Sequence, residues 1–231
     1  MLPSCVSSVY SLEKDEGEVT NVTPKDEITP GLAIDMGLSV KWASCNIGAS
    51  SPEQYGGYYA WGETEMKKDY DWPTYKWCNN STDYPFTKYC NNSNYGYNGL
   101  VDNKTQLDAS DDVAHIKWGS SWRMPTSDEM DELLSTERSP FYDWKWKSLN
   151  GHNGWMITYL VNNNSIFLPA AGDWYGINLI NVGSKGFYGS SSLYTRNPNC
   201  SCSMAFSSDY VSSSCGSSDR SIGLTVRPVT E

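Results

Sequence analysis

The feature that most constrains this chain is a serine-rich stretch at residues 190–221, followed by an apolar segment at 223–229 (GLTVRPV). The stretch has thirteen serines among thirty-two residues, together with Cys200, Cys202 and Cys215. Small polar side chains stand where a core-forming sequence would place apolar ones. Because the segment after it must pair back into the fold as a strand, we expect polar loops held on a rigid scaffold, where binding functions commonly lie.

Composition narrows the class of protein. The chain has 231 residues, enough for one large or two small domains. Only 19% of residues are charged, and ten Trp and sixteen Tyr replace much of the usual aliphatic content. This is typical of a β-rich, extracellular protein. The net charge of −10 without a basic cluster argues against nucleic acid or an anionic membrane as partner.

The seven cysteines cannot all pair within the chain. No pair of CxxC motifs occurs and there are only two histidines, so we expect no zinc site and no cofactor. Cys78 and Cys90 lie twelve residues apart in an Asn- and Tyr-rich segment and are predicted to form a disulfide, the alternative being two free thiols. Cys5 follows Leu-Pro-Ser, which resembles the end of a lipoprotein signal. It is either a lipidation site or an exposed cysteine of the tail.

Residues 1–30 are predicted to form a flexible linker, because residues 6–30 carry six acidic residues and little apolar surface. The globular domain is expected to span residues 31–231. Alternation, capping and turn signals in it predict an α+β fold with two short helices, small antiparallel sheets and long loops. The expected strands are 38–48, 58–61, 155–161, 166–169 and 223–229, and the expected helices are 111–118 and the segment opening at Thr126, with Glu129 completing a capping box.

Five phrases of the sequence resemble the Fibrobacter succinogenes major paralogous domain family, from about residue 31 to the C-terminus. They are 35–43 (DMGLSVKWA), 58–63 (YYAWGE), 118–126 (WGSSWRMPT), 167–172 (FLPAAG) and 226–229 (VRPV). The resemblance implies a C-type lectin-like fold. It also implies a secreted or surface protein of a gut bacterium, in some cases lipid-anchored to the outer membrane, and a distant relation to formylglycine-generating enzymes. Arg123 and Arg227 lie within these phrases and are predicted to be buried, paired structural residues.

The chain departs from the family pattern in the serine-rich stretch. Ser, Cys, Gly and Asp stand where relatives often carry Asn and Tyr, which is what adenine-directed mutation would produce. This resembles the variable region of proteins diversified by retroelements, and the alternative is neutral drift of a surface loop. Phe206, Leu224 and Val226 are expected to be buried between the variable positions.

The leading interpretation is therefore a non-enzymatic cell-surface protein that binds an extracellular protein or glycan. Its polar face before the last strand is expected to project to solvent. The predicted ligand-binding residues are Trp174, Tyr188, Tyr194, Arg196, Asn199, Ser201, Ser203, Ser212, Ser213, Asp219 and Ser221. The alternatives are a structural or adhesive subunit of a surface assembly and, third, an enzyme related to formylglycine-generating enzymes. Contact with a membrane is expected only through a lipid anchor at Cys5.

Catalytic and metal sites find less support in the sequence. No serine lies in a nucleophile elbow, and His115 and His152 occupy a predicted helix and a predicted turn. Asn197-Pro198-Asn199 resembles the sugar-binding tripeptide of calcium-dependent lectins, but the second ligand set of that motif is missing. We therefore expect no catalytic residues and no metal ligands.

Overall fold

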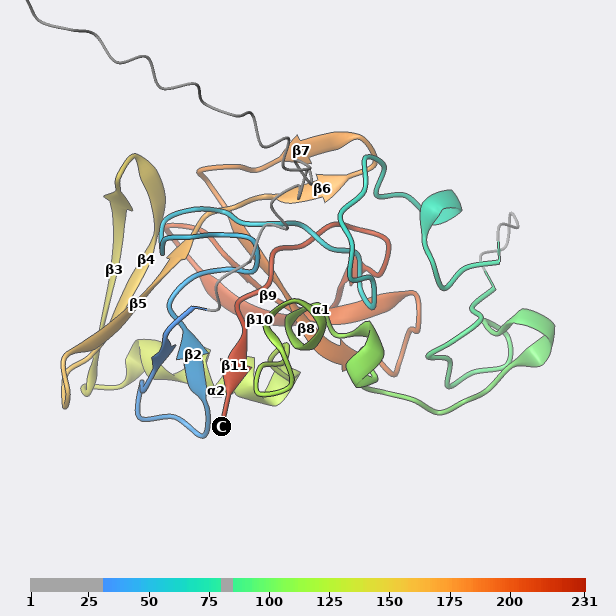
Figure 1. Ribbon diagram of the computed structural model, residues 1–231, viewed down its shortest axis with the longest axis horizontal. Coiled ribbons are helices and arrows are strands. Elements are labelled where there is room, and N and C mark those ends of the chain that lie inside the picture. The colour runs from blue at the N-terminus through green and yellow to red at the C-terminus, as the bar shows by residue number, and fades with distance from the viewer. Residues whose placement is uncertain (1–30, 80–84) are drawn as a thin grey trace, which may run out of the picture.

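The structure is a computed structural model that describes residues 31–79 and 85–231. The predicted linker at 1–30 and the candidate lipidation site Cys5 lie outside the described residues. Figure 1 shows several small sheets arranged around the two helices, with the sheet of β3, β4 and β5 at one end of the molecule. The described part of the chain is thus a mixed α+β fold of short helices and small antiparallel sheets, as predicted.

The first and last strands of the described chain belong to one sheet. Strand β2 (Lys41–Ala43) pairs antiparallel with β1 (Ala33–Ile34) on one side and with β11 (Val229–Thr230) on the other. Trp42 anchors this sheet in the core with no exposed surface. The prediction that the last segment pairs back into the fold is confirmed. Strands β2 and β11 are shorter than the expected strands 38–48 and 223–229.

A second sheet contains the predicted hairpin. Strand β4 (His152–Tyr159) pairs with β5 (Asn164–Pro169), and their polar turn has Asn163 in the left-handed region. On its other side β4 pairs with β3 (Tyr142–Leu149), which the sequence interpretation missed. The signal was present, because Tyr, Trp and Trp at 142, 144 and 146 alternate with Asp, Lys and Lys.

The serine-rich stretch forms strands rather than the expected loops. Strands β8 (Gly186–Leu193), β9 (Cys200–Phe206) and β10 (Val211–Asp219) make an antiparallel sheet in the order β10-β9-β8. A separate hairpin precedes them, formed by β6 (Asp173–Tyr175) and β7 (Asn178–Ile180). In this sheet of three, β9 is central and β10 lies at an edge.

The second helix follows the predicted capping chemistry, and the first begins two residues later than the expected range 111–118. Helix α1 (Val113–Trp118) starts after Asp112, whose side chain accepts hydrogen bonds from the backbone N–H groups of residues 114 and 115. Helix α2 (Ser127–Ser135) opens with the complete capping box of Thr126 and Glu129. Four short 3₁₀ segments complete the described helical structure: η1 (Trp72–Thr74), η2 (Tyr97–Gly99), η3 (Ala109–Asp111) and η4 (Thr136–Arg138).

The largest core cluster lies between α2, β2, the sheet of β3, β4 and β5, and the sheet of β8, β9 and β10. It contains Met130 and Leu133 of α2 together with Met204 and Phe206 of β9. A second cluster gathers residues around α1, and it includes Val226. The predicted burial of Phe206, Leu224 and Val226 is confirmed.

The two framework arginines differ in burial. Arg227 has no exposed surface and donates to the side-chain oxygen of Asn46 and to the carbonyl oxygens of Ala43 and Phe167. Arg123 is partly exposed and pairs with the carboxylates of Glu129 and Glu231. The prediction of a buried, paired arginine is confirmed for Arg227, whereas for Arg123 the pairing is confirmed and the full burial is wrong.

The predicted disulfide between Cys78 and Cys90 is wrong. Both cysteines are free and buried in one cluster with Phe86, where they pack as small apolar side chains. Burial raises the pKa of Cys78 to about 11, so its thiol is protonated at neutral pH. The disulfide that the structure contains joins Cys202 to Cys215 across β9 and β10.

Candidate functional site

Strand β9 is buried along its whole length, which corrects part of the predicted binding face. Tyr188, Ser201, Ser203 and Ser221 were expected at the surface, but each exposes at most 3% of its area. One face of the sheet is covered by α2 through Met204 and Phe206. On the other side, Ser201 borders a small internal space together with Tyr59, Trp61 and Leu224. These four predicted residues therefore cannot reach a ligand.

The buried serines satisfy one another and the backbone. The hydroxyls of Ser203 and Ser218 lie 2.9 Å apart, and Ser190 donates to the carbonyl oxygen of Cys202 at 2.7 Å. Tyr188 stacks on Phe206 and donates its hydroxyl to the carbonyl oxygen of Pro169 at 2.9 Å. Hydroxyls bonded in this way cost little to bury, and their small volume lets two layers approach the central strand closely.

Two exposed residues of the predicted binding face lie near the start of β10. Ser212 and Ser213 are both exposed, and they border a groove of about 450 Å³ between β10 and the end of α2 with η4. The other residues that line the groove are Leu134, Ser135, Glu137, Arg138 and Val211. The sequence interpretation missed this opposite wall, because residues 134–138 carry no motif.

This groove offers mixed chemistry to a ligand. Ser135, Ser212 and Ser213 supply hydroxyls that both donate and accept hydrogen bonds. The side chain of Arg138 is 94% exposed and lies beside the carboxylate of Glu137. Leu134 and Val211 add apolar surface to the lining, and both pack partly against the core. Such a surface can form hydrogen bonds with a sugar or a peptide and can pair with a charged group.

A second group of predicted residues lies at the other end of β9 and β10. Arg196 is exposed, whereas Tyr194, Asn199 and Asp219 are half-buried. Gly216 of β10 leaves no room for a side chain there, because a Cβ would lie 2.5 Å from the ring of Tyr194. Burial raises the pKa of the Asp219 carboxyl, which accepts a weak hydrogen bond from the thiol of Cys200.

The buried side chain of Arg220 holds the loop that carries this second group. The guanidinium has no exposed surface and lies 4.2 Å from the centre of the Phe86 ring. It donates to the carbonyl oxygens of Pro198 in the loop and of Lys88 and Tyr89 in the neighbouring segment. A planar cation with five donors suits this position, since it can satisfy several carbonyl groups and stack on an aromatic ring at the same time.

Trp174 is set apart from both groups. It lies on β6, is half-buried, and packs against the ring of Tyr70 at a centroid distance of 6.0 Å. Its backbone pairs with Gly223 rather than with β9 or β10. The predicted single face is therefore divided into the β10 groove with Ser212 and Ser213, the loop end with Tyr194, Arg196, Asn199 and Asp219, and Trp174 on β6.

We expect the disulfide to hold β10 on the sheet, and this can be measured. The bond closes a loop between directly paired positions thirteen residues apart. Replacing Cys202 and Cys215 together with Ser should lower the free energy of unfolding by about 2–3 kcal/mol, since cross-links of this loop size restrict the unfolded chain by about that amount. Urea unfolding of the oxidised protein, with and without dithiothreitol, measures the effect. The double variant serves as the control, because dithiothreitol should not change its stability. A wild type that is equally stable with and without dithiothreitol would contradict the assignment of a disulfide between Cys202 and Cys215.

A larger concavity of about 510 Å³ lies away from the predicted residues. It opens between α1, the residues after it and the C-terminal strand, and it is lined by Gln106, Leu107, Ala109, Asp112, His115, Ser120, Ser121, Trp122, Arg123, Met124, Ser191, Thr230 and Glu231. Its guanidinium is already held by two carboxylates, with Arg123 donating to Glu129 at 2.6 Å and to Glu231 at 3.0 Å. Asp112 is likewise occupied, because it accepts backbone hydrogen bonds from α1 and from Met124.

Three further observations bear on the class of protein. Among residues 31–79 and 85–231, no group of three or more His, Cys, Asp or Glu side chains is arranged to hold a metal ion. None of the helices in the described ranges is long and apolar enough to cross a membrane. Comparisons with family models, with curated proteins and with solved structures find no match for this chain.

Proposed function

We propose that this chain is a non-enzymatic surface protein that binds an extracellular protein or glycan through the edge of β10 and the adjoining groove. The observation that carries the proposal is the position of Ser212 and Ser213. They are exposed on an edge strand, they face a groove of about 450 Å³, and the strand is linked to the sheet by a disulfide. A rigid strand that presents small polar side chains supplies adaptable hydrogen bonding without loss of the core.

The proposed fold is C-type lectin-like, within the family that the five sequence phrases resemble. Two features support it: the pairing of β11 with β2, which joins the two ends of the domain, and the burial of Trp42, Trp61, Trp118 and Trp122, which lie in three of these phrases. In this proposal the protein is secreted or held at the cell surface, with Cys5 as the lipid attachment point in an outer-membrane lipoprotein.

The proposal also limits which positions can vary. Retroelement diversification requires positions where substitution costs little, and exposed sites usually change stability by no more than about 0.5 kcal/mol. Ser212, Ser213 and Arg196 meet this condition, whereas Ser201, Ser203 and Ser221 do not, because they are buried. We propose that any diversification acts on the exposed set.

Binding to a glycan array and to intact gut-epithelial and bacterial cells tests this function. Wild type should bind a defined subset of these targets. The double variant Ser212→Arg and Ser213→Arg should lose or change that subset by at least about tenfold, since two bulky cations would fill the groove. Ser93→Arg is the matched control, at an exposed serine outside the groove. A double variant that keeps wild-type binding to every target would contradict the proposed surface, provided that it unfolds at the wild-type urea concentration.

A further inference from the structure

The hairpin of β6 and β7 carries an unusual amount of exposed apolar surface. Five large apolar side chains within residues 175–182 are exposed, and Ile177 at the turn is exposed by 70%. They are Tyr175, Ile177, Leu179, Ile180 and Val182. Exposed apolar side chains are ordinary when scattered, but a contiguous group of them marks an interaction surface.

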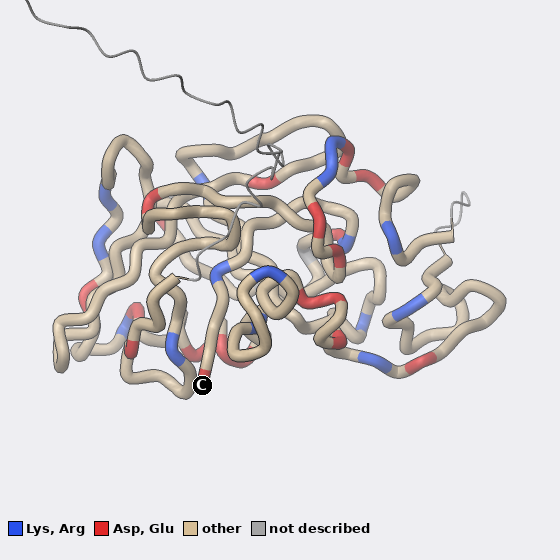
Figure 2. Tube along the Cα trace, in the orientation of Figure 1, with Lys and Arg blue, Asp and Glu red and all other residues tan. Residues whose placement is uncertain are grey.

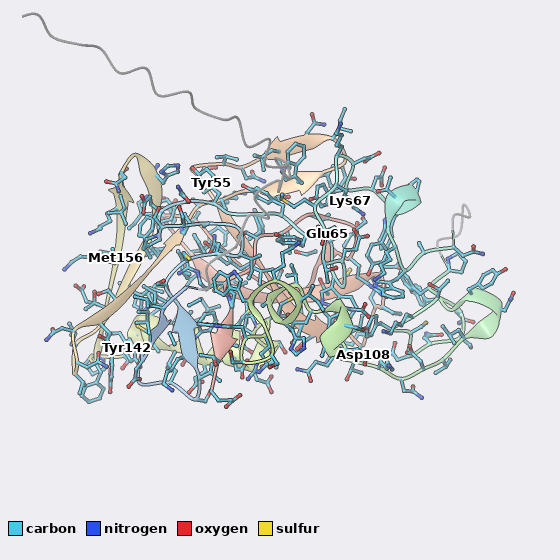
Figure 3. All side chains as sticks on the ribbon, viewed as in Figure 1. Tyr55, Glu65, Lys67, Asp108, Tyr142 and Met156 are labelled. Atoms are coloured by element: carbon cyan, nitrogen blue, oxygen red, sulfur yellow. A yellow bond between two sulfur atoms is a disulfide. The ribbon has the colours of Figure 1, made fainter. Side chains whose placement is uncertain are left out.

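Apart from the buried Asp173, the same hairpin is uncharged on a strongly acidic protein. Residues 174–184 contain no Lys, Arg, Asp or Glu, while the chain as a whole has a net charge of −10. In Figure 2 this hairpin lies at the margin of the molecule and is tan apart from a red segment in β6, with charged residues beside its turn. Figure 3 labels Lys67 below the hairpin, three residues before Tyr70, whose backbone bonds to Gly176 at the turn of the hairpin. The hairpin is therefore a surface through which two acidic copies can meet without bringing like charges together.

The backbone of β7 shows what kind of contact the hairpin can make. Both backbone groups of Trp174 bond to Gly223, because its N–H donates to the carbonyl oxygen of Gly223 and its own carbonyl accepts from the N–H of that residue. They therefore point away from β7, and the register pairs Trp174 with Leu179. In an antiparallel ladder such a pair is not hydrogen-bonded, so the N–H and C=O of Leu179 point to the outer edge of β7. No other residue in the described ranges forms a backbone hydrogen bond with Leu179.

We propose that a second copy of this chain binds at this edge, with the two β7 strands antiparallel about a two-fold axis at Leu179. Leu179 of each copy would exchange both backbone hydrogen bonds with its counterpart, and a sheet of four strands would result. An edge strand with free backbone groups and no Lys, Pro or bulge is a template for strand addition. Because the patch is self-complementary, a closed dimer satisfies it completely.

A second copy fits the hairpin better than a lipid surface does. Lipid would cover the apolar side chains but would leave the outward N–H and C=O of Leu179 without partners. A strand of a second copy satisfies both. The dimer is independent of the ligand surface, and it would place two β10 grooves in one particle, which raises the avidity for a repetitive target.

Sedimentation velocity of the full chain tests this dimer over a concentration series up to about 1 mM. The series extends this high because an interface confined to one short hairpin is small, and small interfaces are usually weak. Wild type should shift from monomer toward dimer as concentration rises. Leu179→Lys should remain monomeric, because it would place two ammonium groups opposite each other at the axis. Leu179→Pro removes only the outward N–H and should also remain monomeric, since edge strands tolerate proline where the N–H faces solvent. Leu160→Lys, at an exposed leucine on another turn, is the control and should dimerise as wild type does.

Three results would overturn the proposal. The first is a wild type that stays monomeric throughout the series, and the second is a folded Leu179→Lys variant that dimerises as well as wild type does. The third comes from hydrogen exchange at the Leu179 amide, which should be fast in dilute protein and at least about tenfold slower in concentrated protein, since fixed hydrogen bonds protect amides from exchange. Protection already complete in the monomer would show that another part of the same chain covers this edge.

Discussion

Replacing Arg227 with Met is expected to lower the free energy of unfolding by about 3–5 kcal/mol. Arg227 is fully buried, and its three hydrogen bonds join its own C-terminal segment to Ala43 and Asn46 at the end of β2 and to Phe167 of β5. Methionine fills much of the same volume but donates nothing. Two backbone carbonyl groups and one amide oxygen would then stay buried without partners, and each such group costs about 1–3 kcal/mol.

Urea unfolding monitored by tryptophan fluorescence measures this loss. Arg196→Met is the matched control, because Arg196 is exposed and the same substitution there should change stability by no more than about 0.5 kcal/mol. Arg227→Lys is informative as well. Lysine keeps the charge but cannot reach three acceptors with a planar fork, so it should restore only part of the stability. Equal stability of the wild type and Arg227→Met would show that these bonds do not hold the three segments together.

The parts of the fold that follow local rules could be predicted from the sequence. The capping box of Thr126 and Glu129 fixed the start of α2, and the polar turn between β4 and β5 marked that hairpin. The return of the last segment to the fold as a strand followed from its apolar pattern, whereas its partner β2 was not predicted. In each case residues close in sequence carry the whole signal.

The serine-rich stretch shows where such reasoning fails. Ser201 and Ser203 have the composition of a surface loop, yet they lie in the central strand β9. The strand is covered on one face by α2, which packs on Met204 and Phe206, and Ser201 borders Tyr59 and Trp61, which lie far away in sequence. The disulfide depends likewise on the register of β9 against β10, which places Cys202 opposite Cys215.

The candidate site could be predicted only in part for the same reason. Ser212, Ser213 and Arg196 are exposed as expected, since an edge strand and a turn remain open to solvent. Glu137 and Arg138 form the opposite wall of the groove, and nothing in their local sequence indicates that β10 passes beside them. Tertiary contacts between distant segments create the groove, so a linear pattern does not contain it.

The same substitution at two serines of this stretch tests the central claim most directly. Ser203→Arg would force a cation into the buried centre of β9, and we expect it to cost at least about 4–5 kcal/mol or to prevent folding. Ser212→Arg lies on the exposed edge strand and should change stability by no more than about 0.5 kcal/mol. Urea unfolding of both purified variants gives the comparison. A severe loss for Ser203→Arg and near wild-type stability for Ser212→Arg is the predicted result, whereas equal effects at the two positions would contradict the division into buried scaffold and exposed binding edge.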